Sequence, residues 1–335
     1  MAEYYRIIGA EMSPYSVKVR SYFRYKAIPH QWVLRNAESQ AEFEKYAKVP
    51  IIPLVVTPEG TGIQDSTPIM DSMEKIYPLP SVHPDDPVAS FISVLIEEFG
   101  DEWGNKWMFH YRWTRDVDQI SSAGRIARMR GAKVDENKHA ALAAQVRARM
   151  VDRLWFVGSN AVTAPQIEAG FVDMLSMLDR HLATRPYLFG ARPAFGDFGL
   201  WGQIYEMWTD PTTGALIGAG APNVLDWVHR MLWPKAEGTF ETWPSLAPTL
   251  MPILTDQVGR LFMPWTCANE TALTEQQEQF SVSIGGKVWT QKPQKYHARS
   301  LHMLREKYAA APDKTALDPV LESAGCLAGL RGLNH

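Results

Sequence analysis

The sequence predicts an α+β N-terminal domain, an all-helical second domain and a C-terminal extension that contains a β-hairpin. Strand and helix patterns alternate over residues 1–79, and a proline-rich linker follows them. Residues 88–232 carry helical periodicity, whereas prolines and turn residues become frequent from about residue 233 onward. We therefore expect three parts, 1–79, 88–232 and 233–335, with the extension packed on the helical domain.

The N-terminal domain opens with a strand and a turn. Residues 4–8, Tyr-Tyr-Arg-Ile-Ile, are rich in strand formers. The turn Ser13-Pro14-Tyr15-Ser16 comes next, and residues at helical spacing follow it up to about residue 28. The turn therefore begins a helix whose N-terminal N–H groups face whatever binds there. It occupies the place of the C-x-x-C redox pair of thioredoxin-like folds, with serines that leave hydroxyl donors beside an anion site.

Two further elements complete this domain. Residues 52–56, Ile-Pro-Leu-Val-Val, form a strand that opens with a proline, where the missing N–H is tolerated. Turn residues occupy 57–60, and a short strand then leads into Asp65-Ser66. Asp65 or Ser66 can cap the next helix, which has Pro68 in its first turn.

These elements together resemble the cytosolic glutathione transferase family, in its bacterial form with a serine at the catalytic turn. The resemblance implies a thioredoxin-like domain with a catalytic hydroxyl at Ser13 and a cis-proline at Ile52-Pro53, whose preceding backbone pairs with the cysteine of glutathione. It also implies that Asp65-Ser66 grips the γ-glutamyl end of this co-substrate. Pro50 is a second candidate for the cis-proline, but the spacing to Asp65-Ser66 favours Pro53.

The hydroxyl that contacts the thiol is not fixed by the resemblance alone. Ser13 aligns with the catalytic position and is the first choice, whereas Tyr15 and Ser16 are neighbours that could replace it. Their alternative roles are a packing tyrosine and a helix-capping serine. Besides Ser13, the glutathione contacts that we expect are Tyr15, Ser16, Ile52, Pro53, Asp65 and Ser66.

Simple magnitudes show what such a hydroxyl can do. A free thiol of this kind has a pKa of about 8.5. A hydrogen bond to a charged acceptor contributes about 1.5–3 kcal/mol, and a helix N-terminus adds about 0.3–1 kcal/mol for an anion. Because one pKa unit corresponds to about 1.36 kcal/mol, the two effects together lower the thiol pKa by about one to three units. Ser13 then acts as a hydrogen-bond donor, and no general base is needed.

A second stretch is similar to the same family. Residues 187–198 resemble the signature that enters the buried helix of its all-helical domain. Ala194 stands where the family usually has Ser or Thr, three residues before Asp197, so we expect a helix cap weaker by about 1 kcal/mol. Residues 222–227 match the last helix of the common core, and the resemblance covers roughly residues 4–232.

The resemblance places the electrophile against the first long helix of the second domain, residues 88–113. Acidic and aromatic side chains crowd this helix between residues 98 and 111. For any single residue, core packing or a solvated acidic face is the alternative role. The residues that we expect to line a pocket for a small hydrophobic electrophile are Met12, Trp103, Trp107, His110 and Tyr111.

The extension lies outside the usual transferase core. We expect a helix over 245–262 that is interrupted near Pro248 and Pro252, and a second helix over 296–308. Residues 280–290 alternate apolar and polar positions around Gly285-Gly286, the pattern of a β-hairpin.

Bulk properties exclude several classes of protein. Among the 335 residues, 46% are hydrophobic and 21% charged, and the net charge is −3, so no nucleic-acid footprint is indicated. No apolar run is long enough to cross a bilayer, and no signal peptide precedes the first strand. The two cysteines do not make a secreted disulfide framework, and no H-E-x-x-H or C-x-x-C spacing supports a metal site. We expect a cytoplasmic protein.

Three functions remain open at this point. The first is a glutathione transferase that joins the thiolate to a hydrophobic electrophile, typically in detoxification. The second is a glutathione-dependent isomerase, dehalogenase or ether-cleaving enzyme on the same fold, and the third is a non-catalytic binding protein. The set of Ser13, Pro53 and Asp65-Ser66 argues against the third. The resemblance also implies a homodimer, the commonest oligomer.

Overall fold

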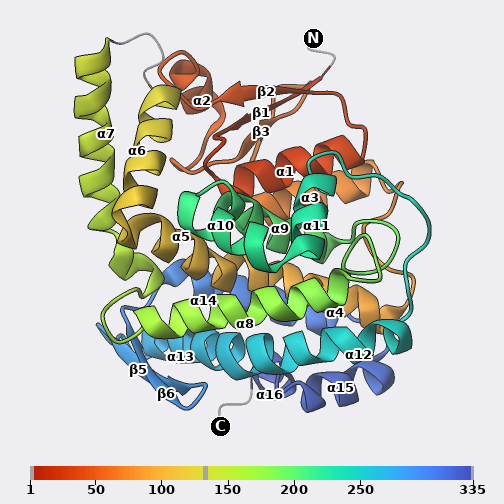
Figure 1. Cartoon of the computed structure of the whole chain (residues 1–335). Coiled ribbons are helices and arrows are strands. Elements are labelled where there is room, and N and C mark those ends of the chain that lie inside the picture. The colour runs from red at the N-terminus through yellow and green to blue at the C-terminus, as the bar shows by residue number, and fades with distance from the viewer. Residues whose placement is uncertain (1–3, 131–134, 333–335) are drawn as a thin grey trace.

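The computed structural model describes residues 4–130 and 135–332. It begins with a four-stranded mixed sheet in the order β2-β1-β3-β4, where β1 and β2 are parallel and the other neighbours are antiparallel. This confirms the predicted thioredoxin-like domain (Figure 1). Its elements are β1 (Tyr5–Gly9), α1 (Pro14–Tyr25), β2 (His30–Leu34), α2 (Gln40–Tyr46), β3 (Leu54–Val56), β4 (Gly62–Gln64) and α3 (Ser66–Ile76).

Side-chain alternation along the strands divides the domain into two apolar layers. Ile7 and Val55 belong to the large core that includes residues of α1 and α3. Ile8, on the opposite face of the same strand, packs with Phe43 of α2 in a smaller cluster. The sheet is therefore covered by helices on both faces.

The strand register brings three loops to one edge of the sheet. Ile8 near the end of β1 pairs with Leu54 at the start of β3, and Leu54 pairs with Gln64 at the end of β4. The turn at Ser13, the segment before β3 and the residue after β4 must therefore lie near one another. These are the three segments that carry the sequence motifs.

The second domain is helical throughout most of its length, as predicted. Its first long helix runs through α4, a π-helical segment η1 and α5, close to the expected residues 88–113. The buried α9 passes through the middle of this domain (Figure 1). The elements are α4 (Pro87–Phe99), η1 (Gly100–Gly104), α5 (Asn105–Thr114), α6 (Asp116–Arg130), α7 (Glu136–Val151), the 3-10 turn η2 (Leu154–Val157), α8 (Ala164–Leu182), α9 (Phe195–Trp208), α10 (Pro211–Gly220) and α11 (Pro222–Arg230).

The start of α9 shows how the chain manages without a capping hydroxyl at Ala194. The carboxylate of Asp197 accepts the backbone N–H groups of Ala194 (2.9 Å) and Leu188 (2.8 Å), and the indole N–H of Trp227 (2.9 Å). Burial raises the pKa of Asp197 to about 7, although these three donors oppose the shift. One carboxylate therefore ties the helix start to the loop before it and to α11.

The C-terminal extension is a layer of helices with one hairpin, which confirms the predicted β-hairpin. Gly285 and Gly286 form its turn with positive φ angles of 57° and 78°, which glycine adopts without strain. The elements are α12 (Trp243–Ile253), the π-helical η3 (Leu254–Phe262), α13 (Met263–Thr274), β5 (Phe280–Ile284), β6 (Lys287–Gln291), α14 (Lys295–Ala309), α15 (Lys314–Ser323) and α16 (Leu327–Arg331).

The expected interruption near Pro248 and Pro252 was wrong. Both prolines lie inside α12, which continues into the π-helical segment η3. Each proline lacks an N–H donor and its ring crowds the carbonyl four residues before it, but Leu246 and Leu250 are fully buried and α12 packs along α8. Tertiary packing therefore maintains the helix where local propensity would end it.

The extension contacts both domains and not the helical domain alone. α14 runs along α4, and its Lys307 forms an ion pair of 3.1 Å with Asp71 of α3. At its other end, Tyr296 reaches Asp65 beside the sheet edge. Figure 1 shows α12 and α13 below α8, with α15 and α16 at the base of the molecule. Within the described ranges, none of the helices has the length and apolar character needed to cross a bilayer.

Candidate active site

Ser13 caps helix α1 at the edge of the sheet. Its backbone is extended, and its Oγ accepts the backbone N–H of Ser16 at 3.3 Å. Within residues 4–130 and 135–332, no acceptor is found for the Ser13 hydroxyl hydrogen. The side chain is half-buried, so a ligand can approach it. Ser13 therefore offers one hydrogen bond to a group that lies beside the helix N-terminus.

Tyr15 and Ser16, the two alternatives to Ser13, are engaged in packing. The Tyr15 hydroxyl donates to the backbone carbonyl of Asp101 at 3.0 Å. Burial, together with the carboxyl groups of Glu102 and Asp101, raises the pKa of Tyr15 well above its usual value. Ser16 is fully buried against Gly9, where an added Cβ would lie 2.8 Å from its Oγ. Neither hydroxyl is placed as openly as that of Ser13.

The segment before β3 has the backbone conformation that the sequence predicts. The peptide bond between Ile52 and Pro53 is cis, and the Pro50 alternative is wrong because the described cis bonds are at Pro53 and Pro80. Pro53 is buried and Ile52 is half-buried. The backbone of Ile52 thus lies next to β3 at the same edge as Ser13.

Asp65 and Ser66 are both engaged within the chain. Asp65 has a positive φ of 76°, which is unusual for a residue other than glycine, and its carboxylate accepts the Tyr296 hydroxyl at 3.0 and 3.1 Å. Ser66 is buried; its Oγ accepts from Lys18 and donates to Asp101 Oδ2, both at 3.3 Å. Asp65 makes no side-chain cap of α3, so simple helix capping does not describe it.

Beneath this pair lies a buried ionic cluster that the sequence motifs did not reveal. The Lys18 ammonium is 2.5 Å from Glu97 Oε1 and 2.6 Å from Asp101 Oδ2. Burial alone would lower the pKa of Lys18, but the carboxylates of Asp101 and Glu97 hold it above its usual value. A signal was present in the sequence, since acidic residues 97, 98, 101 and 102 fall on adjacent turns of an otherwise apolar helix.

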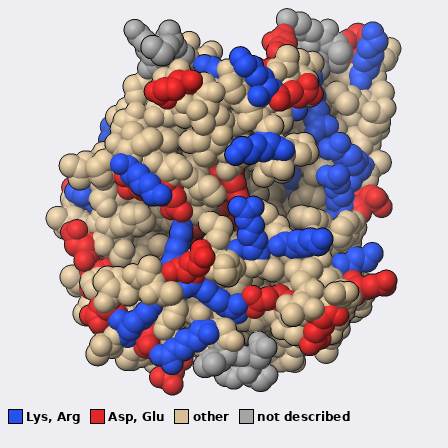
Figure 2. Space-filling model, turned by 180° about the vertical axis from the view of Figure 1, so that it is seen from behind, with Lys and Arg blue, Asp and Glu red and all other residues tan. Residues whose placement is uncertain are grey.

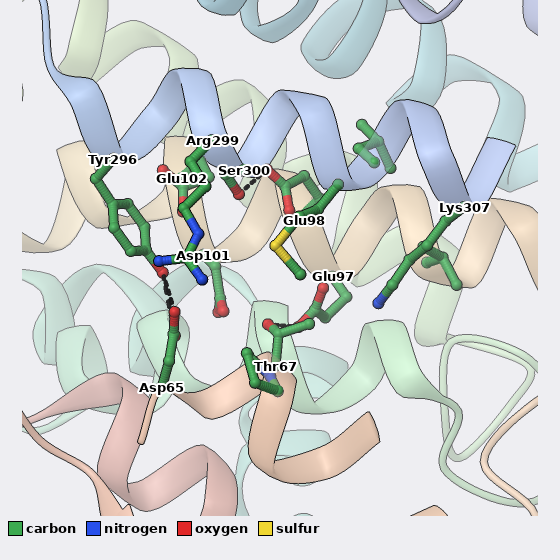
Figure 3. Close-up of a pocket in the computed structure, with 14 residues that line it drawn as sticks. Asp65, Thr67, Glu97, Glu98, Asp101, Glu102, Tyr296, Arg299, Ser300 and Lys307 are labelled. Carbon is green, nitrogen blue, oxygen red and sulfur yellow. Dashed lines mark hydrogen bonds between the residues drawn. The ribbon is translucent and has the colours of Figure 1, made fainter. Parts of the chain in front are cut away.

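A small cavity lies between the start of α3, the α4–η1 segment and α14 (Figure 3). Its volume is about 30 Å³, comparable to the share of one liquid water molecule. Figure 3 shows Tyr296 and Arg299 descending from α14 towards Asp65 and the acidic side chains. The lining residues are Asp65, Thr67, Pro68, Val94, Glu97, Glu98, Asp101, Glu102, Tyr296, Arg299, Ser300, Met303, Leu304 and Lys307.

Three acids of this cavity, Glu98, Asp101 and Glu102, hold their protons more strongly than ordinary carboxyls. Burial raises the pKa of Glu102 and of Asp101 to about 8, with Lys18 opposing both shifts. Glu98 is raised well above its usual pKa by burial and by the neighbouring acids Glu102 and Glu97. Lys18 has the opposite effect on Glu97, whose pKa is lowered although burial acts to raise it. The cavity thus combines one firmly ionised acid with others that titrate near neutral pH.

Glu98 and Glu102 also tie α14 to the helical domain. The Ser300 hydroxyl donates to Glu98, and the ring of His297 contacts Glu102. Burial lowers the pKa of His297 well below its usual value. A neutral imidazole beside Glu102 fits the raised pKa of that acid, since the pair can then share one proton.

The aromatic residues of the first long helix lie in the core, away from this cavity. Trp107 packs against Phe99 and Phe171, and Trp103 packs against Trp265 and Trp289 of the extension. None of the five residues expected to line the electrophile pocket lines the cavity in Figure 3. These five are Met12, Trp103, Trp107, His110 and Tyr111.

Two members of that group, His110 and Met12, form hydrogen bonds that link separate segments of the chain. The buried His110 contacts the Ser159 hydroxyl at 2.7 Å and Glu168 at 3.1 Å. The carbonyl of Met12 accepts a hydrogen bond of 3.1 Å from Arg112. Because Arg112 also pairs with Asp210 (2.6 Å), it fixes the turn before Ser13 to the helical domain. No motif in the sequence pointed to Arg112.

Figure 2 shows the face opposite to that in Figure 1. Lysine and arginine side chains gather around a hollow near the middle of this face, and aspartate and glutamate side chains are spread over the rest of it. Such a distribution favours the approach of anionic ligands to this face.

Comparison with known proteins identifies both domains. The N-terminal domain model of glutathione S-transferases matches residues 7–81, and the C-terminal domain model of the same family matches residues 140–230. No curated protein matches the chain.

Solved structures of low identity also match. A glutathione S-transferase of Methylobacterium radiotolerans, in complex with glutathione sulfonate, is 20% identical over 73% of this chain and 93% of its own, with a TM-score of 0.40. One from Methylobacillus flagellatus, with GSH bound, is 17% identical over 68% and 94%, with a TM-score of 0.40. A GST-like protein of Pseudomonas syringae is 13% identical over 74% of both chains, with a TM-score of 0.45.

These TM-scores are too low to support an argument about the family, so the assignment depends on the two domain models. Both match in the order in which the thioredoxin-like sheet and the helices follow each other in the fold. The chain belongs to the glutathione S-transferase family.

Proposed function

We propose that this protein is a glutathione transferase, in which Ser13 stabilises the thiolate of bound glutathione for attack on a small hydrophobic electrophile. The observation that carries the proposal is the Ser13 hydroxyl, whose hydrogen has no acceptor within the described residues and which lies at the N-terminus of α1. The cis Ile52–Pro53 peptide and Asp65 lie at the same sheet edge. The two family domains, which match glutathione S-transferase models, support glutathione as the co-substrate.

The chemistry follows from this geometry. The thiol of glutathione loses its proton to solvent water, and the sulfur anion accepts the Ser13 O–H while the helix N-terminus adds its partial positive charge. The backbone of Ile52 holds the cysteine of the ligand, and Asp65 holds its γ-glutamyl end. The thiolate then forms a bond to the electrophilic carbon, and the leaving group departs with its electron pair. Isomerase, dehalogenase or ether-cleaving chemistry would use the same thiolate.

A non-catalytic binding protein is the second candidate. The observation that favours it is the contact between Tyr296 and Asp65, since the expected γ-glutamyl site is covered by the extension. The position of Ser13 argues for catalysis, because its oxygen caps α1 while its hydroxyl hydrogen has no acceptor among the described residues and stays available to a thiolate.

The test is a thiolate titration of the glutathione complex, followed by ultraviolet absorbance against pH. Replacing Ser13 by Ala removes one hydrogen bond to a charged group, so the bound thiol pKa should rise by about one to two units. Glutathione affinity near pH 6, where the thiol keeps its proton, should change by no more than a few fold. Ser16→Ala, which alters a buried hydroxyl of the same turn, is the matched control and should titrate like wild type.

Three outcomes separate the possibilities. A shift in Ser13→Ala alone supports the transferase. Wild-type titration in Ser13→Ala would move the role to another group, and Tyr15→Phe would then be measured. A bound thiol pKa near that of free glutathione in every variant would favour the binding protein. Activity against a panel of aryl halides, haloalkanes and aryl ethers then distinguishes transfer from the related reactions.

Assembly, location and role in the cell belong to the same proposal. We infer that two subunits pair in a cytoplasmic homodimer that detoxifies electrophiles. Sedimentation at micromolar concentration should give about twice the chain mass of 37.8 kDa. Only the monomer mass would contradict pairing, and the cover that α14 places over parts of α3 and α4 would then be the structural reason.

A further inference from the structure

We propose that Arg299 of the C-terminal extension binds the carboxylate of the γ-glutamyl end of glutathione, while Asp65 and Asp101 receive its ammonium group. This inference rests on the proposed function and assigns part of the glutathione site to a segment outside the two family domains. A glutathione molecule carries an amino-acid head at that end, with one positive and one negative group on a single carbon atom. The cavity between α3 and α14 presents groups of both signs to match it.

The acidic residues of the cavity include a carboxylate oxygen that has no hydrogen-bond donor among the described residues. Asp101 is 6% exposed and lines the cavity, yet its Oδ1 has no hydrogen-bond partner within the described residues. Its other oxygen, Oδ2, is taken by Lys18 at 2.6 Å. The carboxylate of Asp65 lines the same cavity and accepts only the Tyr296 hydroxyl among the described residues. An ammonium group, with three donors, can serve both acids.

The basic residues of the cavity likewise include a side chain that has no partner among the described residues. Of the two cations that line the cavity, Lys307 is paired with Asp71 at 3.1 Å. Arg299 has no hydrogen-bond or ion-pair partner among residues 4–130 and 135–332. In Figure 3 its guanidinium extends from α14 into the space next to Tyr296 and above Asp101. A guanidinium fits a carboxylate through two parallel hydrogen bonds, so Arg299 suits this end of the ligand better than an ammonium would.

The Tyr296 hydroxyl occupies the position at Asp65 that the ammonium group of the ligand would take. It donates to the Asp65 oxygens. The cavity of about 30 Å³ is too small for an amino-acid head while this side chain is in place. Tyr296 is 43% exposed at the rim, so it can rotate outward without disturbing the core. Glutathione would then replace a hydroxyl donor to the Asp65 carboxylate with an ammonium donor of opposite charge.

Other ligands fit these groups less well. A free metal or amine cation would be repelled by Arg299 and Lys307, and a simple anion would be repelled by Asp65 and Asp101. A zwitterion satisfies the unpartnered Asp101 oxygen and the unpaired Arg299 at once. The site therefore selects the intact tripeptide over thiols that lack the γ-glutamyl group.

The experiment is calorimetry with two ligands whose thiols are blocked, S-methylglutathione and S-methylcysteinylglycine, which lacks the γ-glutamyl group. Arg299→Ala should weaken S-methylglutathione binding by about tenfold or more, the range for a lost hydrogen bond between charged groups. The same variant should bind S-methylcysteinylglycine like wild type. Lys295→Ala, an exposed cation at the start of the same helix and outside the cavity, is the matched control and should change neither ligand.

Tyr296→Phe provides an independent test of the site. It removes the hydroxyl that competes for Asp65, so it should strengthen S-methylglutathione binding. Wild-type affinity in Arg299→Ala, or an equal loss for both ligands, would overturn the role of Arg299 and leave the proposed function standing. A wild-type protein that binds neither S-methylglutathione nor glutathione would instead overturn the proposed function and this inference with it. Because Arg299 is exposed and makes no contact that holds the fold, its variant should fold normally.

Discussion

The Lys18 ammonium and the Glu97 carboxylate form an ion pair of 2.5 Å that is sealed from solvent between the two domains. Lys18 comes from the first helix of the thioredoxin-like sheet, and Glu97 from the first helix of the helical domain. Asp101 and Ser66 complete the coordination of the ammonium. This pair therefore links α1, beside the candidate glutathione site, to α4 of the helical domain.

We expect Lys18→Met to lower the free energy of unfolding by about 3–5 kcal/mol, because the ionised Glu97 would remain buried without its counter-charge. Urea denaturation measures this loss. Lys295→Met, at an exposed position of α14, is the control and should stay within about 0.5 kcal/mol of wild type. Adding Glu97→Gln and Asp101→Asn to Lys18→Met should recover part of the loss. A full-sized loss in this triple variant would mean that packing, and not charge, is responsible.

The raised pKa values of Asp101 and Glu102 predict that stability falls as pH rises towards 8. Both acids have a pKa of about 8 in the folded chain because they are buried, whereas in the unfolded chain they ionise near their ordinary values. The unfolded state therefore binds fewer protons through most of this range, and the free energy of unfolding decreases with pH. The stabilisation that the two protonated acids contribute is fully present below their ordinary pKa values. It is lost as the pH rises through about 8.

Asp197 and Glu206, whose pKa values are raised to about 7, also titrate between about pH 6.5 and 8.5, so the difference between wild type and a Glu102 variant isolates the contribution of Glu102. Glu102→Gln should show a shallower decline than wild type over this window. Asp152→Asn, at an exposed acid, should follow the wild-type curve. Parallel curves for wild type and Glu102→Gln would show that Glu102 ionises normally in the folded protein.

Gly259 tests how the extension docks. A Cβ at this position would lie 1.7 Å from the backbone oxygen of Ala324, a contact that cannot form without moving α15 away from η3. We expect Gly259→Ala to be strongly destabilising in thermal unfolding, as is typical of overpacking against backbone. Gly218→Ala on the exposed side of α10, where nothing lies within 4 Å, should instead stabilise by about 0.4–1 kcal/mol. Equal effects of the two changes would contradict this docking.

Substitutions of Trp107 test whether this residue belongs to the core or lines the electrophile pocket. Its side chain is fully buried among Phe99 and Phe171, so Trp107→Ala should cost about 3–5 kcal/mol of stability. Trp107→Phe keeps most of the packing, and its KM for any hydrophobic electrophile should stay within twofold of wild type. Trp155→Phe, at a residue 49% exposed, is the matched control for stability. A large KM change in Trp107→Phe with normal stability would return Trp107 to the electrophile pocket.

Local signals determined much of the fold. The strand-forming residues at 4–8 and 52–56, the turn before α1 and the Gly285-Gly286 hairpin all act within a few residues, so the sequence alone predicts them. The position of the cis bond at Pro53 was likewise set by its spacing to Asp65-Ser66 in a shared motif. The uninterrupted helix through Pro248 and Pro252 shows where local rules failed, since packing on α8 outweighed two lost hydrogen bonds.

The sequence by itself determined the thioredoxin-like domain, the helical domain and the Ser13 turn, because runs of strand formers, helical spacing and turn residues are short-range properties. Only the tertiary structure decided that Tyr296 meets Asp65 across 231 positions and that Lys18 is buried with Glu97 across 79 positions. It also decided that Trp103 and Trp107 face the core while Glu98 and Asp101 of the same helix segment face a cavity. Such contacts depend on how the extension packs over both domains, and no spacing within one segment encodes that packing.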